Sequence, residues 1–228
     1  MIAVFGGTFD PPHLGHREAL RGLFTESSIR KALIVPSASP PHKPCHAPSH
    51  HREAMARLNF TSTLANPFPS EVEFYLGEME RAQATGKPNY TYDTLTLLAG
   101  TLSRFAFVIG ADQLRDLPTW YRFPEVLKLT HWLVLERLPF GNEIARKTLK
   151  EWEASGLVRK VIYESAGEAW AIRESDKFLR LIPTQAPPLS STEIRETISR
   201  SGSPPIQSLL PEVWGYLKQK GLYGTERK

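Results

Sequence analysis

Two histidines three positions apart, His13 and His16, follow a pair of glycines near the start of the chain. Gly6 and Gly7 come directly after a short apolar run, where the backbone has to turn and can approach a ligand closely. Their spacing matches neither the GxGxxG of a dinucleotide-binding loop nor the GxxxxGKS/T of a P-loop. Two prolines precede His13 and cannot lie inside a helix, so the pattern predicts a helix that begins near His13 or Leu14.

The predicted helix places both histidines on one face of its first turn, because they are three positions apart. A helix N-terminus has unpaired N–H groups and the positive end of the helix dipole, and both favour anions. Two imidazole rings would add further hydrogen-bond donors at the same place. The arrangement therefore suits a polyphosphate that gains charge in a transition state, although a plain turn explains the glycines alone equally well.

A metal site is the main alternative for these histidines. Asp10 is close in the sequence, and a proline-rich stretch further on holds more candidate ligands: His42, Cys45, His46, His50 and His51. A structural zinc site usually combines such side chains at regular spacing. The stretch has no spaced pair of cysteines and is interrupted by prolines, which favours an exposed loop without a metal.

The composition excludes several classes of protein. A chain of 228 residues with 41% hydrophobic and 23% charged residues is typical of a globular domain. No stretch approaches the roughly 18 apolar residues of a membrane-spanning helix, so no membrane partner is expected, and the N-terminus has no features of a signal peptide. The single cysteine, Cys45, excludes an internal disulfide and fits a cytoplasmic location. The net charge of +4 suits anionic small molecules or simply a mixed-charge surface, and without a basic block it predicts no nucleic acid partner.

Short apolar runs alternate with helical stretches along the chain. The runs at residues 2–5, 32–35, 105–109, 132–135 and 179–182 are almost wholly apolar, as strands buried on both faces of a parallel sheet are. Helices are expected at residues 14–25, 51–65, 91–102, 142–155, 192–201 and 206–220. The alternation predicts a doubly wound α/β sheet in one domain, residues 1–228, with ligands bound beyond the carboxyl ends of the strands.

The stretch GGTFDPPHLGH at residues 6–16 resembles the HxGH signature of the nucleotidyltransferase superfamily. The second signature of that superfamily lies near the C-terminus, and LSSTEIR at residues 189–195 is similar to it. Ser190, Ser191 or Thr192 could also cap a helix, which is the common reason for serine and threonine at such a place. Paired with HxGH at the other end of the chain, the second signature becomes specific.

Other segments resemble the bacterial nicotinate-nucleotide adenylyltransferases within this superfamily: PPHKP at 40–44, HREAM at 51–55, NYTYDTL at 89–95, FVIGADQLRDLPTWYRFPEVL at 107–127 and LLPEVWGYLKQKGLYG at 209–224. The likeness covers nearly the whole chain. It implies a Rossmann-like doubly wound parallel sheet, the nucleotidyltransferase fold, with a C-terminal helical segment at about residues 190–222. It also implies a reaction in which ATP and nicotinate mononucleotide give nicotinate adenine dinucleotide and pyrophosphate.

The same resemblance implies roles for individual residues. The expected catalytic residues are His13, His16, Lys43 and Arg195. The expected ATP-binding residues are Gly6, Gly7, Thr8, Phe9, His13, His16, Gly110, Asp112, Arg137, Ser191, Thr192 and Arg195. The residues expected to bind the nicotinate nucleotide are Gly7, Thr8, Lys43, Thr91, Trp120 and Tyr121. Structural alternatives stay open: Trp120 could be a core residue, Asp112 could cap a helix, Lys43 could be a solvated charge, and Tyr90 and Tyr92 are expected to be packing residues.

The implied chemistry needs no nucleophile from the protein. The phosphate of a mononucleotide is already largely ionised at neutral pH, since its second pKa is about 6, and it can attack the α-phosphate of ATP in line without a covalent enzyme intermediate. Catalysis then consists of positioning and charge stabilisation. Mg²⁺ is expected to be bound mainly through the ATP phosphates, with no protein ligand named for it.

Two other functions stay open. Nicotinamide mononucleotide differs from nicotinate mononucleotide in its ring substituent alone, and backbone N–H groups that contact this substituent leave no side-chain signature. A nucleotide-binding regulator without turnover is the second possibility. Such a regulator would be expected to lack some phosphate-binding groups, whereas His13, His16, Lys43 and Arg195 are all present.

Overall fold

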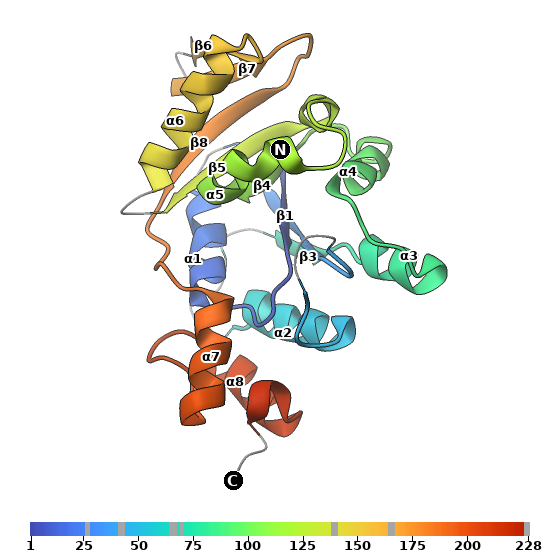
Figure 1. Ribbon diagram of the computed structural model, residues 1–228, viewed down its shortest axis with the longest axis vertical. Helices are drawn as coiled ribbons and strands as arrows, with labels where there is room; N and C mark the ends of the chain where they lie inside the picture. Colours follow the sequence, from blue (N-terminus) through green and yellow to red (C-terminus); the bar gives the residue numbers. More distant parts are fainter. Residues whose placement is uncertain are drawn as a thin grey trace.

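The structure is a computed structural model of the chain, and it describes residues 1–25, 28–40, 44–63, 68, 71–137, 141–163 and 167–225. Its frame is an eight-stranded sheet with the strand order β3-β2-β1-β4-β5-β8-β7-β6 (Figure 1). The strands are β1 (Ile2–Gly7), β2 (Lys31–Pro36), β3 (Glu71–Phe74), β4 (Phe105–Gly110), β5 (His131–Arg137), β6 (Val158–Tyr163), β7 (Gly167–Ile172) and β8 (Phe178–Thr184). The five strands expected from apolar runs are confirmed as β1, β2, β4, β5 and β8.

Neighbouring strands run parallel across β3, β2, β1, β4, β5 and β8. Strands β7 and β6 continue the sheet beyond β8 as an antiparallel hairpin at one edge. The central strands β1 and β4 are apolar because helices cover both faces of the sheet. Side chains alternate across a strand, so Val4 of β1 lies in one core and Phe5 in the other. The predicted doubly wound parallel sheet is therefore confirmed.

The helices are α1 (Leu14–Leu23), α2 (Ser49–Thr61), α3 (Gly77–Thr85), α4 (Thr91–Ala99), α5 (Ala111–Asp116), α6 (Gly141–Ala154), α7 (Ser191–Ser201) and α8 (Pro211–Gln219), with the short 3-10 turns η1 (Leu117–Thr119), η2 (Glu125–Leu129) and η3 (Leu222–Gly224). Helices α1 and α2 pack on the core that contains Phe5. Helices α4, α5 and α6 pack on the core that contains Val4. No helix among the described residues is both long enough and apolar enough to cross a membrane.

A third apolar cluster joins the C-terminal helices to α2. It contains Met55 from α2, Ile194 and Ile198 from α7, and Val213 and Leu217 from α8. Figure 1 shows α7 and α8 beside α2 at the end of the molecule opposite the β6–β7 hairpin. This packing places α7, which carries the second signature, next to the loop that follows β1.

Some elements differ from the expected pattern. Strands β3 and β6 lie at the two edges of the sheet and were not expected, because exposed charged residues interrupt their apolar residues: Glu71 and Glu73 in β3, and Arg159 and Lys160 in β6. The hairpin partner β7 and the short helices α3 and α5 were not expected either. The terminal helix begins at Pro211 and not at residue 206, since Ser208 closes a turn on the Pro205 carbonyl and proline is favoured in the first turn of a helix.

Candidate active site

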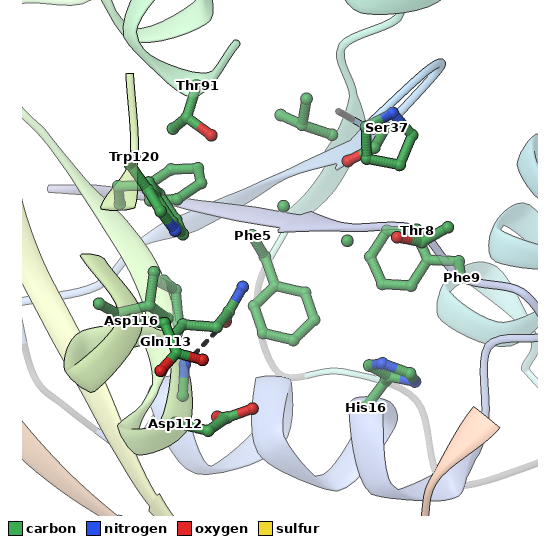
Figure 2. Close-up of a pocket in the computed structure, with 18 of the residues that line it drawn as sticks. Phe5, Thr8, Phe9, His16, Ser37, Thr91, Asp112, Gln113, Asp116 and Trp120 are labelled. Carbon is green, nitrogen blue, oxygen red and sulfur yellow. Dashed lines mark hydrogen bonds between the residues drawn. The ribbon is translucent and has the colours of Figure 1, made fainter. Parts of the chain in front are cut away.

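A cavity of about 780 Å³ lies at the carboxyl ends of β1 and β4. The chain moves from β1 through β2 to β3 on one side and from β4 through β5 to β8 on the other, so the strand order reverses between β1 and β4. Ligands of open α/β sheets bind at such a reversal. Figure 2 shows Trp120, Thr91, Ser37, Thr8, His16 and Asp112 arranged around Phe5, and all of these residues line the cavity.

Most of the residues expected to bind substrates line this one cavity. They are Gly6, Gly7, Thr8, Phe9, His13, His16, Thr91, Gly110, Asp112, Trp120, Tyr121 and Ser191. Thr192 and Arg195 lie on α7 but do not line it. Lys43 lies outside the described residues, and so does the side chain of Arg137, which ends β5. The structure thus brings three distant segments of the sequence together.

The two histidines of the signature form a reciprocal cap at the start of α1. The backbone N–H of His16 donates to Nδ1 of His13 over 3.3 Å, and the backbone N–H of His13 donates to Nδ1 of His16 over 3.2 Å. Because each Nδ1 is an acceptor, the proton of each neutral ring lies on Nε2. The centroids of the two imidazole rings lie 3.7 Å apart. Both histidines line the cavity, and His13 is buried. The expected helix start is confirmed, and the cap fixes which ring nitrogen can act as a donor.

Glycines allow the rings to come this close to the backbone. A Cβ atom on Gly15 would lie 2.9 Å from Nδ1 of His13 and 2.9 Å from the carbonyl oxygen of Pro187. A Cβ atom on Gly7 would lie 2.6 Å from the ring of Phe9, which is buried and has a φ of 51°. The ring of Phe9 in turn packs edge-on against His16. The glycine between the histidines is therefore required by contact with a loop from the far end of the chain.

Asp10 joins the first loop to two other parts of the chain. Its carboxylate accepts N–H groups from His46 and Ala47, over 2.7 Å and 3.1 Å, and the hydroxyl of Tyr223 over 2.6 Å. Burial, together with this bond to Asp10, raises the pKa of Tyr223. Among the described residues, no group of three His, Cys, Asp or Glu side chains is placed to hold a metal, and His42 lies outside them. Asp10 thus acts as a structural acceptor that holds the loop.

The buried guanidinium of Arg52 ties the loops around the cavity to each other. It donates to the carbonyl oxygen of Thr8 over 2.9 Å, to that of Ala38 over 2.7 Å and to that of Ala47 over 3.1 Å. It also donates to the carbonyl of Ser37. Thr8 and Ser37 both line the cavity, from the ends of β1 and β2. The sequence marked this arginine within HREAM, but its role required the tertiary structure.

The side of the cavity near α4 is aromatic. Trp120 lines it and packs against Phe107 and Trp132, with ring centroids 6.5 Å and 6.4 Å away. Tyr121 is 49% exposed and lies 4.7 Å from the ring of Tyr90. Trp120 is therefore anchored in the core and still offers part of its surface to a ligand.

Helix α7 contributes contacts to the first loop as well as to the cavity. Ser190 is its N-cap residue, but its side chain makes no capping bond. The hydroxyl of Ser191 donates instead to the carbonyl of Pro11 over 2.8 Å. Arg195 is buried and donates to the carbonyl of Asp10 over 2.6 Å and to the Thr192 hydroxyl over 3.2 Å. The second signature thus holds the first one in place, while phosphate binding by Arg195 stays a prediction.

The cavity also has polar wall residues that the sequence analysis did not identify. Glu78, Asn89 and Gln113 all line it. Burial raises the pKa of Glu78. The Thr94 hydroxyl donates to the Glu78 carboxylate over 2.8 Å, and this bond opposes part of the rise in pKa. The side chain of Gln113 accepts the backbone N–H of Gly110, so it and not Asp112 supports the start of α5. Asn89 and Gln113 lie within segments that resemble the family, which was their only sequence signal, and Glu78 lies in none of these segments.

Comparisons with known proteins agree with this geometry. The model of the cytidylyltransferase-like family matches residues 4–197. The chain is 33% identical over 229 residues to a probable nicotinate-nucleotide adenylyltransferase of Cronobacter sakazakii, covering 97% of this chain and 94% of that protein. It is 30% identical over 226 residues to the nicotinate-nucleotide adenylyltransferase of Salmonella typhi, covering 97% of each. Its fold is similar to that of Plasmodium falciparum nicotinic acid mononucleotide adenylyltransferase complexed with NaAD, with a TM-score of 0.73 and 18% identity over 100% of this chain and 98% of that one.

Proposed function

The chain belongs to the cytidylyltransferase-like family and, within it, to the nicotinate-nucleotide adenylyltransferases, and from this membership we propose that it transfers the adenylyl group of ATP to nicotinate mononucleotide. The products are nicotinate adenine dinucleotide and pyrophosphate, and the step belongs to NAD biosynthesis. One observation carries the proposal: a single cavity collects the HxGH histidines, the start of α4 with Trp120 and Tyr121, and Ser191 of the second signature. These are the segments expected to bind phosphates and the pyridine ring.

The mononucleotide phosphate supplies the nucleophile. One of its oxygens attacks the α-phosphorus of ATP in line, and the bond to the β-phosphate oxygen breaks, so that pyrophosphate leaves with the electron pair. His13 and His16 donate from Nε2 to phosphate oxygens as charge accumulates on them, because their Nδ1 atoms already accept backbone N–H groups. The glycine loop brings backbone N–H groups close to the same phosphates. Further donors are assigned to Lys43, Arg137, Thr192 and Arg195.

Mg²⁺ is proposed to enter with ATP. The cavity presents Asp112 and Asp116 as single exposed carboxylates, and the described residues form no protein cage for a cation. This donor set suits a Mg²⁺ ion that is held by phosphate oxygens and water. Bound in this way, the ion would neutralise charge on the triphosphate, while the residues of the chain orient the two substrates.

A pyrophosphate-release assay tests the proposal. Purified protein is supplied with ATP and Mg²⁺ and with nicotinate mononucleotide, nicotinamide mononucleotide or neither. We expect release with nicotinate mononucleotide at a kcat/KM at least about tenfold above that with the amide. His16→Ala should bind both substrates and lose roughly 10²–10³ in kcat, the cost of one lost donor to developing charge. Release only in the presence of nicotinamide mononucleotide would assign the other acceptor. No release with either mononucleotide would favour a regulator without turnover.

A further inference from the structure

Tyr223 lies near the C-terminal end of the chain in a backbone conformation that tyrosine rarely adopts. Its φ of 58° and ψ of 27° place it in the left-handed region, between Gly221 and Gly224, which also have positive φ values. Such a conformation costs free energy in a residue other than glycine, and it persists only where the surrounding structure requires it. A left-handed tyrosine therefore calls for a contact that offsets this cost.

The contact is a hydrogen bond between the two ends of the chain. The Tyr223 hydroxyl donates to Oδ1 of Asp10 over 2.6 Å, and the Asp10 side chain is buried. Burial and this bond raise the pKa of the Tyr223 hydroxyl above its usual value of about 10, so the hydroxyl keeps its proton and donates at neutral pH. The same oxygen of Asp10 accepts the backbone N–H of Ala47 over 3.1 Å. The tyrosine hydroxyl and this amide thus share one buried carboxylate oxygen.

Asp10 connects this contact to the histidines of the HxGH signature. Its backbone carbonyl accepts a hydrogen bond from the buried guanidinium of Arg195 over 2.6 Å. Two prolines follow Asp10 directly, and their rings restrict the backbone that leads to His13. A shift of the Asp10 carboxylate is therefore passed on to the start of α1, where the reciprocal cap of His13 and His16 fixes their donors.

We propose that Tyr223 is a positioning residue for adenylyl transfer: its hydroxyl holds Asp10, and through Asp10 it holds the two histidines in place against the phosphates. This inference rests on the proposed function, in which both histidines donate to phosphate oxygens as charge accumulates. Tyr223 does not line the cavity, so its effect has to pass through Asp10. The last turn of the chain then completes the phosphate site that the loop after β1 begins.

Tyr223→Phe tests the inference, because it removes the hydroxyl and keeps the ring. We expect kcat for pyrophosphate release to fall roughly 5- to 50-fold, less than the effect of about 10² that a displacement of 1 Å has at a positioned group. KM for ATP and for nicotinate mononucleotide should change less than about threefold, because the displaced donors act in the transition state. The Tm should fall by about 2–12 °C, since a buried carboxylate oxygen loses a donor.

Tyr216→Phe is the matched control. Tyr216 lies in α8, its hydroxyl is 2.8 Å from Nδ1 of His51, and it does not line the cavity. This variant also loses one hydroxyl and one hydrogen bond, so its Tm should fall by about 1–6 °C, while kcat and both KM values stay unchanged. An equal loss of kcat in the two variants would assign the effect to the stability of the C-terminal helices and would overturn the inference.

A double-mutant cycle with Asp10→Asn tests the route of the effect. If Tyr223 acts through Asp10, Tyr223→Phe should lower kcat less than about twofold once Asp10→Asn is present. An equal effect of Tyr223→Phe with and without Asp10→Asn would contradict the inference, and so would a Tyr223→Phe enzyme with the kcat of the wild type. A wild type that releases no pyrophosphate with either mononucleotide would refute the proposed function and this inference with it.

Discussion

Adding one methyl group between the two histidines should disable the site. In Gly15→Ala the new Cβ would lie 2.9 Å from Nδ1 of His13 and 2.9 Å from the backbone oxygen of Pro187. Carbon atoms do not approach polar atoms this closely, so either the His13 ring or the Pro187 loop has to move. Either movement disturbs the reciprocal cap, because His13 Nδ1 accepts the backbone N–H of His16.

Opposing effects set the size of the change. Alanine favours a helix over glycine by about 0.5–1 kcal/mol. Overpacking costs about 1–3 kcal/mol, and loss of a cap costs about 1 kcal/mol. The free energy of unfolding should therefore fall by about 1–3 kcal/mol, which lowers the Tm of a chain of this size by about 2–12 °C. Activity should fall further, by roughly 10² in kcat, because a displacement of about 1 Å at a positioned group has an effect of that order.

Thermal melting followed by circular dichroism and pyrophosphate release at saturating substrates measure both effects. Gly215→Ala is the matched control, because Gly215 lies in α8 and a Cβ atom there has no neighbour within 4 Å. This control should raise Tm by about 1–4 °C and keep full activity. If Gly15→Ala melted and reacted like the wild type, neither the contact with Pro187 nor the placement of His13 would matter for function.

Three further predictions concern the walls of the site and the far end of β5. Trp120→Ala should raise KM for nicotinate mononucleotide roughly tenfold and leave KM for ATP nearly unchanged, because the ring is expected to stack on the pyridine. Arg52→Lys should lower the free energy of unfolding in urea by about 2–4 kcal/mol, since one ammonium group cannot serve the carbonyls of Thr8, Ala38 and Ala47 together. Burial lowers the pKa of His131 from 6.5 to about 4. Between pH 6.5 and 4 the imidazole of His131 is therefore protonated in the unfolded chain but not in the folded chain. The free energy of unfolding should accordingly be highest above pH 6.5 and fall by about 1–3 kcal/mol as the pH falls towards 4.

Each of these predictions has a result that contradicts it. A larger rise in KM for ATP than for the mononucleotide would move Trp120 to the adenosine side. An Arg52→Lys variant with unchanged stability would mean that water replaces the lost bonds. His131→Phe keeps the ring that stacks on Phe178 and cannot titrate, so its stability should vary less between pH 4 and 6.5. Equal pH dependence in variant and wild type would assign the effect to other groups.

The strands that could be predicted are those buried on both faces, because a continuous apolar run is visible in the sequence wherever a strand has no exposed side. Strands β3 and β6 were missed for the opposite reason, since edge strands carry charged residues such as Glu71, Glu73, Arg159 and Lys160. The start of α1 was predicted to within one residue, because prolines restrict the backbone locally. The predicted start of the terminal helix at residue 206 was wrong, because a turn closed by Ser208 replaces the first part of the expected helix.

The types and spacing of His13 and His16 are properties of the chain alone, and they are enough to predict a helix N-terminus that suits phosphates. The orientation of the two imidazole rings cannot be predicted from the chain alone, because it depends on Gly15 lying against the carbonyl of Pro187 and on loops held by Asp10 and Arg52. Such contacts join residues far apart in sequence, so no local pattern records them.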